Sequence, residues 1–170
     1  MDHAATTFVK PDVAESMIPF LKEHFGNPSS LYSIGREAKE AIETAREKLL
    51  QIALVAFGAI FLLVYPLGLI WPSGWVWHGG EGKYYFQMIC GVYAVLGVYL
   101  IAAARNPSKH RSLISFTIWS SVVHAGIMLA QSIHDEHERG HLIGDVPALL
   151  LVAAVLWFLS PTKQNRLGTA

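Results

Sequence analysis

The pattern of apolar and polar positions divides the chain near Leu49 and Leu50. Before this point polar residues recur at the spacing of water-soluble helices, and after it apolar residues run long enough to cross a bilayer. The first 48 positions hold 14 of the 26 charged residues, whereas the remaining 122 hold 12. The two parts therefore suit different surroundings, which are water for residues 1–49 and lipid for residues 50–163, with 164–170 as a tail.

Four apolar segments after this division have the length of membrane spans. A hydrocarbon core of about 30 Å requires about 20 helical residues. Four buried helices of a soluble protein would leave too little polar surface to cover them. Pro66 should bend or end the first helix before Trp71, Trp75 and Trp77, whose indoles suit the headgroup zone. We predict an all-α fold, a four-helix transmembrane bundle with an N-terminal soluble helical appendage and spans at about 50–71, 84–104, 112–131 and 146–160.

Basic residues gather at one end of these spans. Two lie in the loops at the opposite end, Lys83 and Arg139. Seven lie before the first span, between the second and third, and after the fourth: Arg46, Lys48, Arg105, Lys109, Arg111, Lys163 and Arg166. The positive-inside rule predicts a multi-pass protein of the cell inner membrane with both termini cytoplasmic and the lipid bilayer as its partner. Basic residues confined to span ends give no indication of nucleic-acid binding.

Polar residues and glycines inside the spans indicate how the helices meet. Thr117, His124 and Gln131 are seven residues apart and should face the bundle interior. An ionisable side chain at membrane depth is costly unless paired, so His124 is a functional candidate. The favoured interpretation is a neutral imidazole hydrogen-bonded to a carbonyl or hydroxyl of a neighbouring helix. Gly91 and Gly97 each open a Gly-Val-Tyr triplet and are predicted close-packing positions.

The loop between the third and fourth spans is rich in histidine and carboxylate. Residues 134–141 contain three of each. On a continuous helix, His134, His137 and His141 would share one face and could bind zinc, copper or nickel. However, Gly140 favours a helix end, and no His-Glu-x-x-His motif is present. A solvated, charged turn is therefore favoured over a metal site.

Asp145 follows this loop and is its further candidate residue. It can cap the N-terminus of the short fourth span, and Pro147 suits the first turn of that helix because its missing N–H costs nothing there.

Residues 2–49 read as two helices joined by a Gly-Asn-Pro-Ser-Ser turn. The first helix is expected over residues 11–24, and the second begins at about Ser33. Neither Gly nor Pro occurs in residues 37–56, so the second helix should continue unbroken into the first span. One face of the second helix carries Ala38, Ala41, Ile42, Ala45 and Leu49.

Four motifs occur in order in this stretch: Asp2-His3-Ala4-Ala5-Thr6-Thr7, Gly26-Asn27-Pro28-Ser29-Ser30, Gly35-Arg36-Glu37-Ala38 and Ala45-Arg46-Glu47-Lys48. In this order and spacing they resemble the N-terminal segment of cysteine desulfurases, which belong to the class V aminotransferase group. His3 stands where many members of that family carry Asn.

The resemblance implies an enzyme that uses pyridoxal phosphate. Such chemistry needs a lysine for the Schiff base, in this family within Ser-x-His-Lys, and a cysteine that receives the sulfur. Ser108-Lys109-His110 reverses that order, and Cys90, the single cysteine, lies within a predicted span. We therefore assign no catalytic residue and do not expect pyridoxal phosphate to bind.

Residues 50–163 resemble a family of small, uncharacterised bacterial membrane proteins with four predicted spans. We predict a polytopic membrane protein with a binding or structural role within the bilayer. Two alternatives stay open, an inactive desulfurase-related fragment and a membrane component that binds metal or haem, and self-association into a homo-oligomer also stays open. The resemblance is carried by Tyr65-Pro66, Trp71-Pro72-Ser73-Gly74-Trp75, Trp119-Ser120-Ser121, Val123-His124-Ala125 and residues 140–147.

Overall fold

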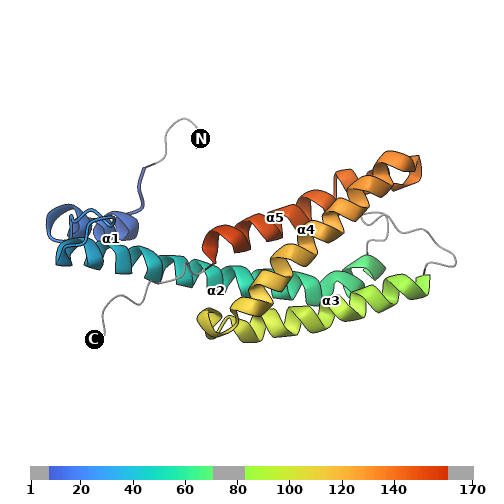
Figure 1. Ribbon diagram of the computed structural model, residues 1–170, viewed down its shortest axis with the longest axis horizontal. Helices are drawn as coiled ribbons and strands as arrows, with labels where there is room; N and C mark the ends of the chain where they lie inside the picture. The colour runs from blue at the N-terminus through green and yellow to red at the C-terminus, as the bar shows by residue number, and fades with distance from the viewer. Residues whose placement is uncertain (1–7, 71–82, 161–170) are drawn as a thin grey trace. The chain divides into compact units, whose positions relative to one another are not determined.

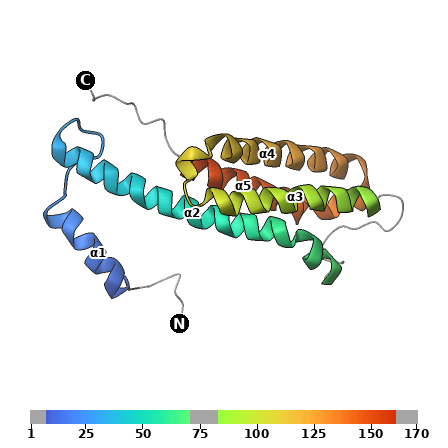
Figure 2. The same cartoon turned by 90° about the horizontal axis from the view of Figure 1, so that it is seen from below.

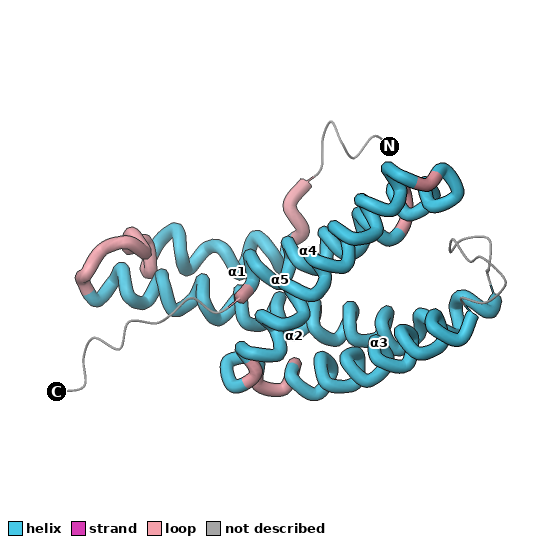
Figure 3. The backbone as a smooth tube through the Cα atoms, turned by 45° about the vertical axis from the view of Figure 1, so that its right-hand side comes forward, coloured by secondary structure: helices cyan, strands magenta, loops and turns pink. Residues whose placement is uncertain are grey.

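The computed structural model describes residues 8–70 and 83–160, which are helical throughout apart from short turns (Figures 1 and 3). No strand occurs in these two ranges, so the predicted all-α fold is confirmed. The element order is α1 (Pro11–Lys22), α2 (Ser33–Ile70), α3 (Lys83–Ala103), the short 3-10 helix η2 (Pro107–Lys109), α4 (Arg111–His134), the 3-10 helix η3 (Glu136–Leu142) and α5 (Asp145–Leu159).

In the part of the chain that the structure describes, four helical segments are long and apolar enough to cross a membrane. They are Ser33–Leu67, Tyr84–Ala103, Arg111–His134 and Glu136–Leu159. The predicted spans agree with these segments to within a few residues at most ends. The length of uninterrupted apolar sequence was therefore sufficient to locate the helices.

The single helix α2 contains both the second predicted soluble helix and the first predicted span. The expected continuity between them is therefore confirmed. The helix continues past Pro66 to Ile70, so this proline does not end it. Trp71, Trp75 and Trp77 lie outside the described residues, as does the first desulfurase-like motif, Asp2 to Thr7.

Residues up to Ala45 form a compact unit of their own. In this unit α1 contains no buried residue. The His24 imidazole hydrogen-bonds the Glu37 carboxylate at 3.2 Å across the turn. Of the predicted apolar face on α2, Ala38 is buried, whereas Ile42 is 46% exposed. The unit is therefore held by few buried contacts.

Residues from Arg46 onwards form the second unit, a bundle to which α2, α3, α4 and α5 all contribute (Figure 2). Its largest core cluster contains Leu50, Leu54, Phe61, Leu100, Ala104, Ile114, Ile118, Val152, Ala153 and Leu156. The helices α2, α4 and α5 each supply at least two of these side chains. The helix α3 supplies Leu100, and Ala104 lies just beyond its end.

Two glycines allow α2 and α3 to approach closely. A Cβ atom on Gly58 would lie 2.7 Å from the carbonyl oxygen of Gly97, and a Cβ on Gly97 would collide with the carbonyl oxygen of Gly58. The close-packing prediction is therefore confirmed for Gly97. It is wrong for Gly91, where a Cβ would meet nothing within 4 Å. Gly58 was not predicted, because only its partner shows why it must be small.

Candidate functional site

The polar side chains of α4 do not all face the bundle interior. Thr117 is fully buried, His124 is half-buried, and Gln131 is exposed, so the prediction for Gln131 is wrong. Seven residues fall short of two helical turns by about 20°, and the deviation accumulates along a straight helix. Ser132, which is 2% exposed, occupies the interior position instead.

Two buried hydroxyls of α4 lie within hydrogen-bond distance of carbonyl oxygens of their own helix. Thr117 Oγ1 donates to the Leu113 carbonyl at 2.9 Å, and Ser132 Oγ lies 2.8 Å from the Met128 carbonyl. Among the described residues, no buried side-chain nitrogen or oxygen lacks a hydrogen-bond partner. Polar groups inside this bundle are thus compatible with a surrounding that offers no water.

His124 forms the interhelical hydrogen bond that was expected of a buried histidine. Its Nδ1 lies 2.5 Å from the hydroxyl oxygen of Tyr93 on α3. The Tyr93 ring also meets Phe61 of α2 edge-on, with a centroid distance of 5.0 Å. These three side chains connect α2, α3 and α4 in the interior of the bundle.

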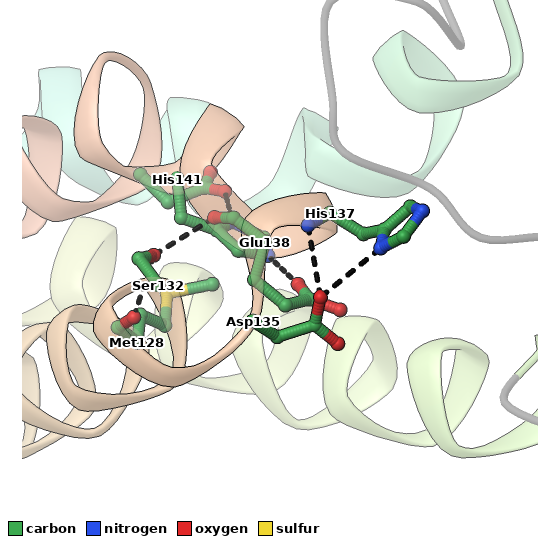
Figure 4. A network of polar contacts seen from close by, with 7 residues as sticks. Met128, Ser132, Asp135, His137, Glu138 and His141 are labelled. Atoms are coloured by element: carbon green, nitrogen blue, oxygen red, sulfur yellow. Dashed lines mark hydrogen bonds and ion pairs between the residues drawn. The ribbon is translucent and has the colours of Figure 1, made fainter.

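A second polar group joins η3 to the start of α5. His141 lies between two carboxylates, with Nε2 at 2.8 Å from Glu138 Oε2 and Nδ1 at 2.5 Å from Asp145 Oδ2. The side chains of His141, Glu138 and Asp145 are 11%, 25% and 23% exposed. Figure 4 shows His141 and Glu138 beside the end of α4.

The imidazole of His141 is the shared partner of this group. One of its ring nitrogens contacts Glu138 and the other contacts Asp145, so the ring orientation is fixed from both sides.

The involvement of Asp145 corrects its predicted role. The N-cap of α5 is Gly144, and no side-chain capping bond is made there. Asp145 is the first helical residue, and its carboxylate is bonded to His141. A capping side chain belongs to the residue before the first helical residue, so Asp145 lies one position too late to make the capping bond.

Side chains around Ser132 hold η3 against the end of α4. Ser132 Oγ lies 2.8 Å from the Glu138 carbonyl oxygen as well as near that of Met128. Asp135 caps η3 by accepting from the backbone N–H of His137 at 2.9 Å. Figure 4 shows these contacts from close by. The turn that carries Glu138 and His141 is thus anchored at both ends.

The three histidines of the loop have separate partners. His134 Nδ1 lies 2.8 Å from the Ala130 carbonyl, His137 bonds Asp135, and His141 is taken by two carboxylates. Within residues 8–70 and 83–160, no group of three His, Cys, Asp or Glu side chains is placed to hold a metal ion. Metal binding by these histidines stays a prediction. The prediction of a solvated turn is wrong for His141, which is buried.

Both polar groups are candidate sites. Tyr93 and His124 join α3 to α4, and Glu138, His141 and Asp145 join η3 to α5. Glu138 and Tyr93 were not among the predicted site residues. Glu138, His141 and Asp145 are spaced by three and four residues, and this spacing was the sequence signal that could have identified Glu138. The contact of Tyr93 with His124 depends on how α3 and α4 are rotated against each other, which the sequence pattern does not show.

Comparisons with known proteins give two family matches, which overlap at residues 44–60. The profile described as "Family of unknown function (DUF6632)" matches residues 44–165, and that described as "Aminotransferase class-V" matches residues 1–60. No solved structure matches.

The curated relatives that match are similar to the N-terminal segment. Cysteine desulfurase IscS of Clostridium botulinum strain Hall is 56% identical over 48 residues, which are 28% of this chain and 12% of that protein. IscS of Dictyoglomus turgidum is 59% identical over 49 residues, which are 29% of this chain and 12% of that protein. IscS of Dechloromonas aromatica is 44% identical over 75 residues, which are 44% of this chain and 16% of that protein. The predicted resemblance to cysteine desulfurases is confirmed, and it spans a small part of those enzymes.

Proposed function

The chain belongs to the family of unknown function DUF6632, which covers residues 44–165, and we propose that it is a multi-pass protein of the inner membrane with a binding or structural role within the bilayer. Both termini and the loop of residues 104–110 face the cytoplasm. The turn formed by η3 faces the opposite side. The site around His141 and His124 is the functional centre of the bundle.

The apolar exterior of the bundle, together with its buried hydroxyl groups, is the observation that carries this proposal. Thr117, Ser121 and Ser132 are buried, whereas large apolar side chains on the outside of α3, α4 and α5 are more than half exposed, among them Val92, Phe116, Trp119, Val123, Leu151 and Phe158. Exposed apolar area in water costs about 25 cal/mol per Å². Hydrocarbon removes that cost, while polar groups must find partners inside.

The charge pattern supports the orientation. Arg105 and Lys109 lie between α3 and α4, and Arg111 is the first residue of α4. Arg46 and Lys48 lie in α2 just before its apolar part. The opposite connection, between α4 and α5, carries Arg139 as its one basic residue, which is ion-paired with Glu136 at 3.0 Å. Basic residues are retained on the cytoplasmic side during insertion.

The N-terminal segment is an appendage in this proposal. The matched part covers 12 to 16% of the IscS relatives, so the activity of the whole enzyme is not carried over. The lysine of the Ser-x-His-Lys motif, which that family uses for the Schiff base, has no counterpart in this sequence. The purified protein should therefore be colourless, without the absorption band of pyridoxal phosphate or haem.

Membrane fractionation with a pair of matched variants tests the proposal. The full chain should sediment with membranes, resist an alkaline carbonate wash and dissolve in detergent. Val95→Arg should lower the carbonate-resistant fraction, because Val95 is 58% exposed within α3 and arginine at the centre of a span costs about 3 kcal/mol. Ile42→Arg, at a 46% exposed position of the N-terminal unit, should leave that fraction unchanged. Equal behaviour of both variants, or recovery of the protein without detergent, contradicts the proposal.

A further inference from the structure

We propose that the groove between the start of α4 and the end of α5 binds the headgroup of an anionic phospholipid, with the Arg111 guanidinium on the phosphate. This inference rests on the membrane location proposed above. It adds a specific ligand class and a site remote from His141.

The groove has a volume of about 470 Å³. Its lining on α4 runs from Arg111 and Ser112 at the start of the helix to Ile118, about two turns further on. Figure 2 shows the start of α4 and the end of α5 at the same end of the bundle. Its polar lining comes from Arg111, Ser112, Ser115 and Ser160, and its apolar lining from Ile114, Ile118 and Trp157. A phospholipid has the same succession of chemistry, from a charged headgroup to acyl chains.

The charge of the polar end selects a negative headgroup. Among the side chains that line the groove, Arg111 is the one that carries a charge. A guanidinium presents parallel N–H donors that match two oxygens of one phosphate. Basic pockets between helices at the cytoplasmic side of a bilayer are recognised sites for anionic lipids.

The walls of the groove are suited to an acyl chain. The Trp157 indole lies edge-on to Trp119 with a centroid distance of 6.1 Å, which holds it on the outside of α5. It is 60% exposed, so a chain can lie against it. The Ser160 hydroxyl donates to the Leu156 carbonyl at 2.6 Å. The hydroxyls of Ser112 and Ser115 are therefore the ones that would contact a phosphate bound by Arg111.

A second groove at this end provides an internal comparison. It lies between α2 and α3, has a volume of about 590 Å³, and is lined by Gln51, Ile52, Val55, Ala56, Ile101, Ala104 and Arg105. It also has one arginine, but its remaining polar side chain is a single amide. The α4–α5 groove offers an arginine together with hydroxyls and is the stronger headgroup site.

Quenching of Trp157 fluorescence by brominated lipid tests the proposal. In the full chain, phenylalanine replaces each of Trp71, Trp75, Trp77 and Trp119, so that Trp157 is the one tryptophan whose fluorescence is measured. It is reconstituted in phosphatidylcholine vesicles that contain a low, equal mole fraction of acyl-brominated phosphatidylglycerol or acyl-brominated phosphatidylcholine. We expect the phosphatidylglycerol to quench at least twice as strongly.

Variants of Arg111 and Arg105 show which arginine causes the stronger quenching by phosphatidylglycerol. Arg111→Gln should remove the difference between the two lipids, Arg111→Lys should retain part of it, and Arg105→Gln should leave it intact. Ser115→Leu, which fills the groove without changing charge, should also lower quenching by phosphatidylglycerol. Circular dichroism of each variant checks that helix content is unchanged.

Each remaining outcome counts against the proposal. Equal quenching by both lipids, or a selectivity that follows Arg105 instead of Arg111, overturns it. Loss of the selectivity on addition of millimolar inorganic phosphate would assign the site to a free anion and also overturns it. Failure of the protein to enter phosphatidylcholine vesicles would instead contradict the membrane location itself, so the two failures are distinguishable.

Discussion

The hydroxyl oxygen of Tyr93 on α3 lies 2.5 Å from Nδ1 of His124 on α4, so a single hydrogen bond joins two helices inside the bundle. Phe61 of α2 packs edge-on against the same tyrosine ring. A polar pair that is enclosed by apolar helices has no water to replace either partner. The pair therefore stabilises one arrangement of α3 against α4.

A double-mutant cycle measures this stabilisation. Tyr93→Phe and His124→Ala each remove one partner, and the double variant removes both. We expect a coupling free energy of about 1 kcal/mol, within the range of interhelical hydrogen bonds in membrane proteins. The measurement is the free energy of unfolding of the purified protein in a detergent titration. Additive effects of the two substitutions would show that the hydrogen bond contributes nothing.

Substitution of His141 by alanine should lower the free energy of unfolding more than the same substitution of His137. His141→Ala leaves the carboxylates of Glu138 and Asp145 without their shared donor, at a cost of about 2–3 kcal/mol. His137→Ala is the matched control, because that side chain is 85% exposed, and it should change the free energy of unfolding by less than about 0.5 kcal/mol. Equal effects of the two substitutions would contradict the assigned role of His141.

The glycine contact between α2 and α3 predicts a position-specific effect of a single methyl group. Gly97→Ala places a Cβ against the backbone of Gly58 and should cost about 1–3 kcal/mol. Gly91→Ala adds the same atom where nothing lies within 4 Å and should be neutral or slightly stabilising. Thermal unfolding in detergent distinguishes the two. Comparable midpoints for both variants would contradict the close approach of the helices.

Sequence reasoning located the helices better than it located their contacts. Apolar length and the absence of Gly or Pro between residues 37 and 56 were sufficient for the spans and for the continuity of α2, because both are local properties of the chain. Gln131 was misplaced because a seven-residue repeat does not follow a helix of 3.6 residues per turn. The pairing of Tyr93 with His124 depends on the relative rotation of two helices, which no local pattern encodes.

The N-terminal unit should exchange its amide hydrogens faster than the bundle. No residue of α1 is buried, and its large apolar side chains include Leu21, which is 71% exposed. An isolated helix of 12 residues is marginal in water. Hydrogen exchange followed by mass spectrometry should show α1 amides exchanging at least tenfold faster than those around Leu54, which is fully buried. Equal protection would show that α1 is held by contacts stronger than those described.

Accessibility of single cysteines tests the membrane topology most directly. In a Cys90→Ala background, Ser108→Cys, Ile143→Cys and Val92→Cys probe η2, the turn before α5 and the outside of α3. The probe is a membrane-impermeant maleimide. In intact cells it should label Ile143→Cys alone, and after membrane disruption it should label Ser108→Cys as well. Val92→Cys should stay unlabelled throughout, because a thiol in hydrocarbon does not form the reactive thiolate. Labelling of Ser108→Cys in intact cells, or of Val92→Cys at the rate of the other two, would contradict the account.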